Sequence, residues 1–450
     1  MYISRNIDRE LIRWKNEKQR KPLILRGVRQ CGKTAAVRHL GESFPSYVEI
    51  NLEKNVRLHR LFEDDIRIDS ILARFEIETG TKIIPGETLL FLDEIQECPR
   101  AITALRYFYE EKPDLHIVAA GSLLEFALNR KKKNTLQFPV GRVRSIYMYP
   151  FSFAEYLTAV GQPLLREKLE SFSDFREENP AHDRLMDHYK NFMVVGGMPE
   201  AVSCFAKTTS FLETQNVHRD IVMNFREDFD RYDSNISADN IRRVFEYSFH
   251  NACGQVRAAS AVDGMTAYKF KEALDLLKRA GLVIPVKSSS CETLPLGSGE
   301  KEANIKILPF DTGIFLTELC LNTGDILGAE FFDDLNKGSL AELSTGLEFI
   351  KAADPYTEAN LFYWYRSGAN AEVDYVFQKG SSIIPVEVKS SRKGGMKSIR
   401  VFLDHHGGEY GIRISMENFA KYQNIQVVPL YAAGMITGAG LSSPRSHRFH

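Results

Sequence analysis

The stretch LILRGVRQCGKTAAV, residues 23–37, contains a glycine, four further residues and then Gly-Lys-Thr. The apolar run PLILRG at residues 22–27 is short enough for a buried parallel strand. Residues 33–44 have the apolar spacing of a helix, which Gly41 can end. When a strand, a glycine-rich turn and a helix follow one another, the backbone N–H groups at the helix start point at phosphate oxygens. The stretch therefore predicts a phosphate-binding loop.

The polar positions of this loop have separate expected tasks. Gly27 and Gly32 allow the backbone to turn and to approach a triphosphate closely. Lys33 is expected to reach the β- and γ-phosphates, and Thr34 is expected to bind Mg²⁺. The expected nucleotide contacts are Gly27, Val28, Arg29, Gln30, Cys31, Gly32, Lys33, Thr34 and Ala35.

A second motif, ETLLFLDEIQECP at residues 87–99, supports this interpretation. Its apolar residues 89–92 predict a buried strand with Asp93 and Glu94 at the carboxyl end, where ligands bind in open α/β sheets. Asp93 would hold the Mg²⁺ that Thr34 also contacts, and Glu94 would polarise the attacking water. The alternative is that both acids cap the helix that begins near Pro99. Because both motifs occur in order on their expected elements, ATP with Mg²⁺ is the expected ligand.

Three more predicted strands complete a parallel sheet wound by helical crossovers, at residues 46–52, 115–122 and 142–150. The second of them ends in Ser122, near the expected γ-phosphate. A polar side chain there can sense hydrolysis, or it can cap the helix that follows, and both roles are compatible.

The bulk composition fits a soluble chain of two or three domains. The 450 residues are 44% hydrophobic and 26% charged, and the net charge of −1 argues neither for nor against nucleic acid. The six cysteines include no CxxC pair, which excludes a zinc ribbon and fits a reducing cytoplasm. The N-terminus lacks an apolar signal core, and no apolar run is long enough to span a bilayer. We expect a cytoplasmic protein with no membrane partner.

A family resemblance can now be stated. The segments GVRQCGKT, LLFLDEIQECP, AAGSLLE, FPVGRV and YPFSFAEYL resemble the AAA+ ATPases of a prokaryotic family described as predicted ATPases with a C-terminal domain of unknown function. The similarity continues through YKNFMVVGGMPEAV, RDIVMNFREDFDRY and IPVEVKS, and it covers residues 5–435. The resemblance gives the roles described above to Lys33, Thr34, Asp93, Glu94 and Ser122.

Basic residues gather at positions 130–133, 142 and 144. In AAA+ proteins an arginine beyond the sensor strand can reach the γ-phosphate of a neighbouring subunit and stabilise the transition state. Arg142 is the candidate for this finger. The alternative is an exposed basic loop that touches nucleic acid or only water.

The middle of the chain predicts a helical lid and a winged helix. Residues 151–235 have a helical pattern that is broken at VVGGMPE, residues 194–200, and residues 218–232 predict an amphipathic helix leading out. Residues 260–286 then predict a helix capped by Thr266, ended by Gly281 and followed by an apolar strand. The basic residues of this helix, which could contact phosphates, are Lys269, Lys271, Lys278 and Arg279. A structural or protein-docking wing is at least as well supported.

The C-terminal part predicts a helix at residues 340–353 and then two strands, which include AEVDYVF (371–377) and IIPVEVK (383–389). Side chains alternate along a strand, so paired strands would bring Asp374, Glu387 and Lys389 onto one polar face. With Glu342 from the helix, this constellation resembles the core of PD-(D/E)XK nucleases. Carboxylates suit Mg²⁺, and Mg²⁺ with a lysine would activate water. The alternative is a salt-bridged cluster in a domain that keeps the fold without cleavage.

The sequence therefore predicts an α/β chain of four parts and a tail. These are an AAA+ P-loop core (1–160), a helical lid (161–217), a winged-helix domain (218–300), a nuclease-like α/β domain (301–437) and a disordered tail (438–450). The expected function is that of an ATP- and Mg²⁺-dependent switch acting on or near DNA or RNA. The alternatives are a regulatory ATPase with protein partners or self-association only, and an ATP-gated nuclease.

Overall fold

The computed structural model describes residues 2–63, 66–121, 138–171, 177–232, 236–321, 324, 337–366, 371–391 and 395–437. Ser122, the basic residues 130–133 and the tail at 438–450 lie outside these ranges. Within the described residues, no helix combines the length and the apolar character needed to cross a membrane.

The first sheet is parallel and contains the two sequence motifs. Its strand order is β2-β3-β4-β1-β5, and every neighbouring pair is parallel. This confirms the predicted parallel sheet. Its strands are β1 (Leu23–Arg26), β2 (Ser46–Asn51), β3 (Thr88–Asp93), β4 (His116–Ala120) and β5 (Arg144–Tyr147).

Helices cover both faces of this sheet because its strands are apolar on both sides. Leu89 and Phe91 of β3 pack in one hydrophobic cluster with residues of α1 (Ile7–Lys15) and α2 (Lys33–Gly41). Leu90 and Leu92 pack in a second cluster with α3 (Ile68–Thr79) and α4 (Pro99–Glu111). Alternate side chains of one strand therefore serve opposite faces, as the two-residue period of a strand requires.

A helical region follows, which runs through α6 (Phe153–Ala159), α7 (Pro163–Ser171), α8 (His182–Val195), α9 (Pro199–Thr208) and α10 (Phe211–Asp228). The expected break at VVGGMPE separates α8 from α9. Helix α10 begins earlier than the predicted start at residue 218, because Ser210 caps it by accepting from the Glu213 N–H at 3.2 Å. The domain boundary predicted between residues 217 and 218 therefore falls inside a continuous helix.

The expected helix and strand of the wing are present as α12 (Ala267–Arg279) and β7 (Val283–Ser289). Thr266 caps α12, and Gly281 follows the helix with a φ of +74°. The neighbouring elements are α11 (Ala238–His250), β6 (Gln255–Val256) and β8 (Glu300–Pro309).

Strands β6, β7 and β8 share a mixed nine-stranded sheet with the C-terminal strands, in the order β13-β14-β12-β11-β10-β9-β7-β8-β6. The link is a parallel pairing of β7 with β9, in which Val286 lies opposite Leu361. The division predicted at residue 300 thus crosses a continuous sheet, although the domain scheme itself stays a prediction. The C-terminal strands are β9 (Leu361–Arg366), β10 (Ala371–Lys379), β11 (Ser382–Val388), β12 (Gly411–Ser415), β13 (Ala420–Tyr422) and β14 (Ile425–Pro429).

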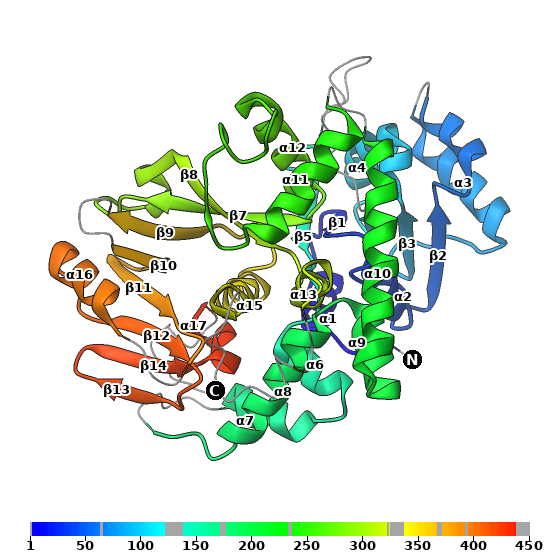
Figure 1. Cartoon of the computed structure of the whole chain (residues 1–450). Helices are drawn as coiled ribbons and strands as arrows, with labels where there is room; N and C mark the ends of the chain where they lie inside the picture. The colour runs from blue at the N-terminus through cyan, green and yellow to red at the C-terminus, as the bar shows by residue number, and fades with distance from the viewer. Residues whose placement is uncertain are drawn as a thin grey trace.

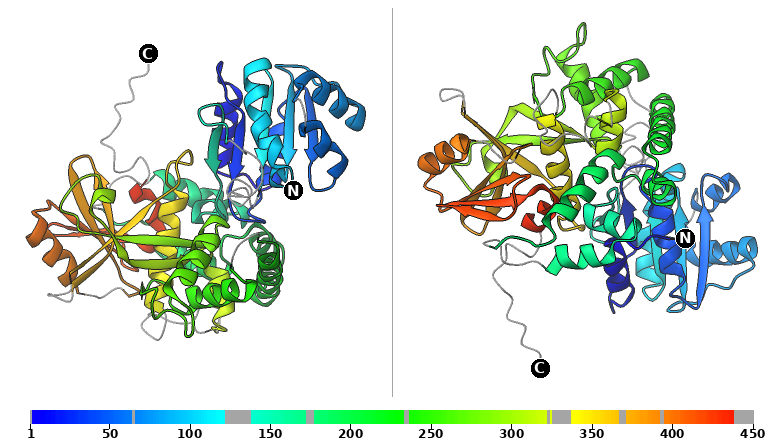
Figure 2. Two further views of the ribbon diagram at one scale, coloured as in Figure 1. Left: turned by 90° about the horizontal axis from the view of Figure 1, so that it is seen from above. Right: turned by 60° about the horizontal axis from the view of Figure 1, so that its bottom comes forward.

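The two sheets lie on opposite sides of the molecule, with helices at their junction (Figure 1 and Figure 2). The helices that accompany the nine-stranded sheet are α13 (Thr312–Glu318), α15 (Lys337–Lys351), α16 (Lys397–His406) and α17 (Gly434–Thr437).

Asp311 is a buried link across this junction. Its carboxylate caps α13 by accepting from the Ile314 N–H at 3.0 Å, and it also accepts from the Gly197 N–H at 2.6 Å. A Cβ at Gly196 would lie 2.2 Å from the same carboxylate, so this turn needs its glycine. The turn between α8 and α9 is therefore fastened to the C-terminal half.

Candidate functional site

The phosphate-binding loop joins β1 to α2 at residues 27–32. Gly27 has a φ of +149° and Gly32 a φ of +98°, conformations that favour glycine. A Cβ at Gly27 would also lie 2.1 Å from the Met148 carbonyl oxygen, so the residue after β5 packs directly on the loop. Gln30 adds a φ of +64° within the loop. The predicted turn of the backbone is therefore present at both glycines.

Lys33 lies over this loop. Its ammonium donates to the carbonyl oxygens of Gly27 and Val28, each at 2.9 Å, and the residue is buried. An ammonium group has three N–H donors, so one remains for a further acceptor. The two carbonyls thus hold the charge of Lys33 in place for a phosphate oxygen.

Thr34 and Asp93 meet at the carboxyl end of the sheet. The Thr34 hydroxyl donates to the Asp93 carboxylate at 3.2 Å, and the Asn51 amide lies 3.5 Å from the same carboxylate. Burial, and then the negative charge of Glu94, raises the pKa of Asp93. A hydroxyl and a carboxylate are the hard oxygen ligands that Mg²⁺ prefers, so this pair fits the predicted metal.

Glu94 has a left-handed backbone conformation, and a hydrogen bond fixes its side chain. Its φ is +49°, and its carboxylate accepts from the Gln96 side-chain amide at 2.7 Å. Gln96 also packs against Gly121 at the end of β4, where a Cβ would lie 2.2 Å from its Oε1 atom. Gln96 therefore links the predicted water-polarising acid to the strand that precedes Ser122, a residue outside the described ranges.

Gln96 and Asn51 were not predicted from the sequence. Asn51 is the last residue of β2 and lies opposite Asp93 in the register. A polar residue at the end of a predicted strand is the sequence feature that could have indicated its place in the site. Gln96 lies two residues beyond Glu94, and only its side-chain direction shows its role.

Arg142 lies at the amino ends of the parallel strands, whereas the loop lies at their carboxyl ends. It precedes β5, whose first residue pairs with the first residue of β1, whereas the loop follows the last residue of β1. Its guanidinium donates to Glu110 at 2.9 Å and is about half exposed. Arg142 therefore does not join the nucleotide site of its own chain, and its role toward a neighbouring chain stays a prediction.

Elements from outside the first sheet contact the loop at Val28, Arg29 and Cys31. Arg5 donates to the Cys31 carbonyl at 3.2 Å and pairs with buried Glu155 of α6 at 3.0 Å. Arg29 pairs with Asp228 of α10 at 2.5 Å. The turn after α12 packs against Val28, since a Cβ at Gly281 would lie 3.3 Å from Val28. The N-terminal segment, the end of α10 and the turn after α12 thus all meet at the loop.

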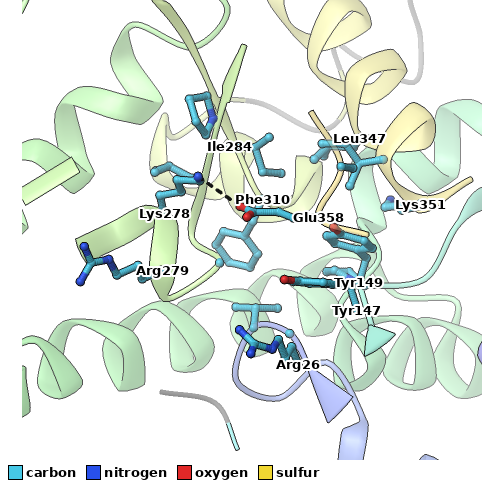
Figure 3. Close-up of a pocket in the computed structure, with 18 of the residues that line it drawn as sticks. Arg26, Tyr147, Tyr149, Lys278, Arg279, Ile284, Phe310, Leu347, Lys351 and Glu358 are labelled. Carbon is cyan, nitrogen blue, oxygen red and sulfur yellow. Dashed lines mark ion pairs between the residues drawn. The ribbon is translucent and has the colours of Figure 1, made fainter. Parts of the chain in front are cut away.

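A cavity of about 310 Å³ lies beside the loop, between the first sheet and the wing. Figure 3 shows aromatic and basic side chains around it, with Arg26 on the loop side and Lys278 on the wing side. Lys278 pairs with Glu358 at 3.1 Å, and Arg279 pairs with Asp275. These two basic residues of α12 therefore have acidic partners within the chain, whereas Lys269 and Lys271 are exposed.

The predicted C-terminal constellation is gathered on one side of the nine-stranded sheet. Asp374 and Glu387 lie on the paired strands β10 and β11, and the Asp374 carboxylate accepts from the Val388 N–H at 2.7 Å. Glu387 pairs with Lys389 at 2.7 Å, and burial raises the pKa of Glu387. Burial raises the pKa of Glu342 of α15, and the nearby charge of Asp374 raises it further. The four residues therefore occupy one region.

Its centre is an ammonium group. Lys306 of β8, which was not predicted from the sequence, lies 2.8 Å from Glu342, 2.5 Å from Glu372 and 3.8 Å from Asp374. Its side chain is only 1% exposed. Burial lowers the pKa of Lys306, but the three carboxylates raise it by more. Among the described residues, no three His, Cys, Asp or Glu side chains are placed to hold a metal ion.

The chain matches three families along its length. Residues 19–157 match a family described as an AAA domain. Residues 186–324 and 337–433 match two families described as Domain of unknown function, DUF8612 and DUF4143. The first match identifies an AAA-type ATPase domain that contains the loop and the Asp93–Glu94 edge, and it implies nucleotide binding.

The solved structures that match this chain include three proteins of low sequence identity. The Walker-type ATPase of Pyrococcus abyssi is 15% identical, with a TM-score of 0.44 over 71% of this chain and 96% of that chain. The Aeropyrum pernix ORC1 protein in complex with DNA is 11% identical, with a TM-score of 0.31 over 72% and 93%. AMPPCP-bound DnaA from Aquifex aeolicus is 13% identical, with a TM-score of 0.25 over 60% and 86%. No curated protein matches the sequence.

The first prediction concerns the ammonium of Lys306. Replacing Lys306 by Met should lower the free energy of unfolding by about 3 kcal/mol or more, because carboxylates then face one another without a cation. Lys287→Met is the control, since its partly exposed pair with Glu300 should contribute less than about 1 kcal/mol. Urea unfolding followed by the fluorescence of Trp364 in a Trp14→Phe background reports on the nine-stranded sheet alone. Equal loss in both variants would contradict the assigned role.

The second prediction concerns the pH dependence of that stability. Burial raises the pKa of Glu342 from 4.5 to about 8, so the folded chain holds a proton there that the unfolded chain has lost. Unfolding then releases a proton, and the contribution of Glu342 to stability should fall as pH rises between about 5 and 8. Glu342→Gln should remove this part of the slope in the same fluorescence assay. An unchanged slope would show that Glu342 is ionised throughout.

Proposed function

We propose that this chain, with its AAA-type ATPase domain at residues 19–157, binds ATP with Mg²⁺ and hydrolyses it as a molecular switch. One observation carries the proposal. The ammonium of Lys33, the Thr34–Asp93 pair and Glu94 lie together at the carboxyl edge of the parallel sheet, after β1 and β3, around a loop with two left-handed glycines. This is the set of groups that phosphoryl transfer requires, because positioning and charge supply most of its catalysis.

Each group has a distinct contribution in this proposal. The loop amides and the free N–H of Lys33 bind phosphate oxygens. Thr34 and Asp93 hold Mg²⁺, which neutralises charge that develops on the phosphates. Glu94 accepts a hydrogen bond from the attacking water, and the Gln96 amide fixes the direction of its carboxylate. Ser122 follows the end of β4 in sequence and is proposed as the polar group that senses hydrolysis.

The proposed partner of the switch is DNA or RNA. The start of α12 supports this because it exposes Tyr268, Lys269 and Lys271 together, and Tyr268 is 71% exposed. An aromatic side chain next to lysines can stack on a base while the ammonium groups contact phosphates. The competing proposal, in which the wing binds only proteins, draws support from the internal ion pairs of Lys278 and Arg279.

Nuclease activity is less well supported than switching. Cleavage of a phosphodiester in this class would need a divalent cation among Glu342, Asp374 and Glu387. The ammonium of Lys306 already lies 2.8 Å from Glu342 and 3.8 Å from Asp374, where a second cation would be repelled. A structural role for the cluster is therefore the simpler proposal.

The third prediction tests nucleotide binding and hydrolysis separately. Lys33→Ala should abolish ATP binding, because it removes the charge held over the loop. Glu94→Gln should leave ATP affinity within about twofold and slow turnover at least about a hundredfold, because Glu94 acts mainly in the transition state. Titration calorimetry and phosphate release measure the two effects. Equal loss of affinity in both variants would overturn these roles.

The fourth prediction tests the nucleic-acid partner. The full chain should bind single- or double-stranded DNA or RNA with an affinity that falls with salt. Lys269→Glu with Lys271→Glu should weaken this binding and reduce the slope of affinity against salt by about 2, one for each lysine. Lys168→Glu with Lys207→Glu changes the net charge equally on α7 and α9 and should have a smaller effect. No binding at low salt would favour protein partners only.

A further inference from the structure

Arg29 is the third residue of the loop GVRQCGKT, and its side chain leaves the first sheet. Its Nη1 atom lies 2.5 Å from both oxygens of Asp228, the last residue of α10. The Arg29 side chain is 39% exposed, whereas that of Asp228 is 5% exposed. A charged pair therefore joins the phosphate-binding loop to the end of the long lid helix.

The acidic residues around Arg29 affect the pKa of its guanidinium. The largest single effect on its pKa is burial, which lowers it, but Asp228, Glu94 and Glu53 together raise the pKa of Arg29 above its usual value. Glu94 is the proposed water-polarising residue, and its charge is near enough to Arg29 to contribute to this rise. Because Arg29 belongs to the loop itself, a phosphate held by the loop amides would be within reach of its side chain.

Arg29 has a choice of acceptors when a triphosphate is bound. The planar guanidinium binds carboxylate and phosphate oxygens with the same paired geometry. A γ-phosphate carries more negative charge than a single carboxylate, and ADP offers no such group at that position. The two nucleotides therefore differ in what they offer to Arg29.

We propose that Arg29 distinguishes ATP from ADP by exchanging Asp228 for the γ-phosphate. This inference rests on the proposed function, since it requires a nucleotide in the loop. With ADP, Arg29 stays paired with Asp228 and the end of α10 stays fastened to the loop. With ATP, the guanidinium turns to the γ-phosphate and α10 loses this connection.

The connection reaches the rest of the chain through α10. Arg226, two residues before the end of the helix, pairs with Glu318 of α13 at 2.8 Å. His218, further back on α10, lies 2.9 Å from the Val195 carbonyl at the end of α8. Release of Asp228 would thus act on a helix that also contacts the lid and the C-terminal half.

The test compares nucleotide affinities of the full chain with Mg²⁺ by titration calorimetry, using ADP and a non-hydrolysable ATP analogue. Arg29→Ala should weaken the ATP analogue about tenfold, which corresponds to about 1.4 kcal/mol, and change ADP by less than about twofold. Arg29→Lys should recover only part of the preference, because an ammonium lacks the paired geometry. Asp228→Asn should strengthen the ATP analogue about threefold without changing ADP, because Arg29 then loses its competing partner.

Arg226→Ala is the matched control. It removes an arginine of similar exposure, 40%, from α10, the helix that carries Asp228, and it should change neither affinity. ADP affinity also verifies that each variant is folded. Equal weakening of ADP and the ATP analogue by Arg29→Ala would overturn the inference and leave Arg29 as a support of the loop. Weakening of the ATP analogue by Asp228→Asn would overturn the exchange. A wild-type chain that binds neither nucleotide would instead refute the proposed function itself.

Discussion

The ammonium of Lys33 donates to the carbonyl oxygens of Gly27 and Val28 and so holds the phosphate-binding loop in its conformation. Several other parts of the structure pack on this loop. The loop is small, yet the N-terminal segment packs on it through Arg5, α10 through Asp228 and the turn after α12 through Gly281. Because protein interiors are close-packed, a change in the loop conformation displaces the elements that contact it. A single ligand in the loop can therefore bias the arrangement of several parts of the chain.

The ATPase domain was predictable from the sequence because its signals are local. Each of the two motifs, the strand with its loop and the strand that ends in Asp93 and Glu94, is contained in about fifteen residues. Over such a length the hydrophobic period and the placement of glycines are informative. The nine-stranded sheet was not predictable in the same way. The pattern of β7 shows that it is a strand, but not that one of its edges pairs with β9 more than seventy residues later in the chain.

The same reason explains the outcome for the candidate sites. Asp374 and Glu387 could be placed together because they lie on consecutive paired strands. Lys306 comes from β8, and nothing in its own surroundings in the sequence marks it as the partner of Glu342 and Glu372. A cluster that the sequence presents as metal-binding acids is thus balanced by a buried ammonium, which favours a structural role for the C-terminal sheet. Arg29 was predicted as a loop residue, but its partner Asp228 lies at the far end of a different helix.

The central claim is that occupancy of the loop is transmitted to all the elements that pack on it. Hydrogen exchange of the full chain, with and without Mg²⁺ and a non-hydrolysable ATP analogue, tests it most directly. We expect altered exchange in the loop together with residues 2–8, 225–232 and 278–283, which carry Arg5, Asp228 and Gly281. Altered exchange confined to the loop and the Asp93–Glu94 edge would contradict the claim.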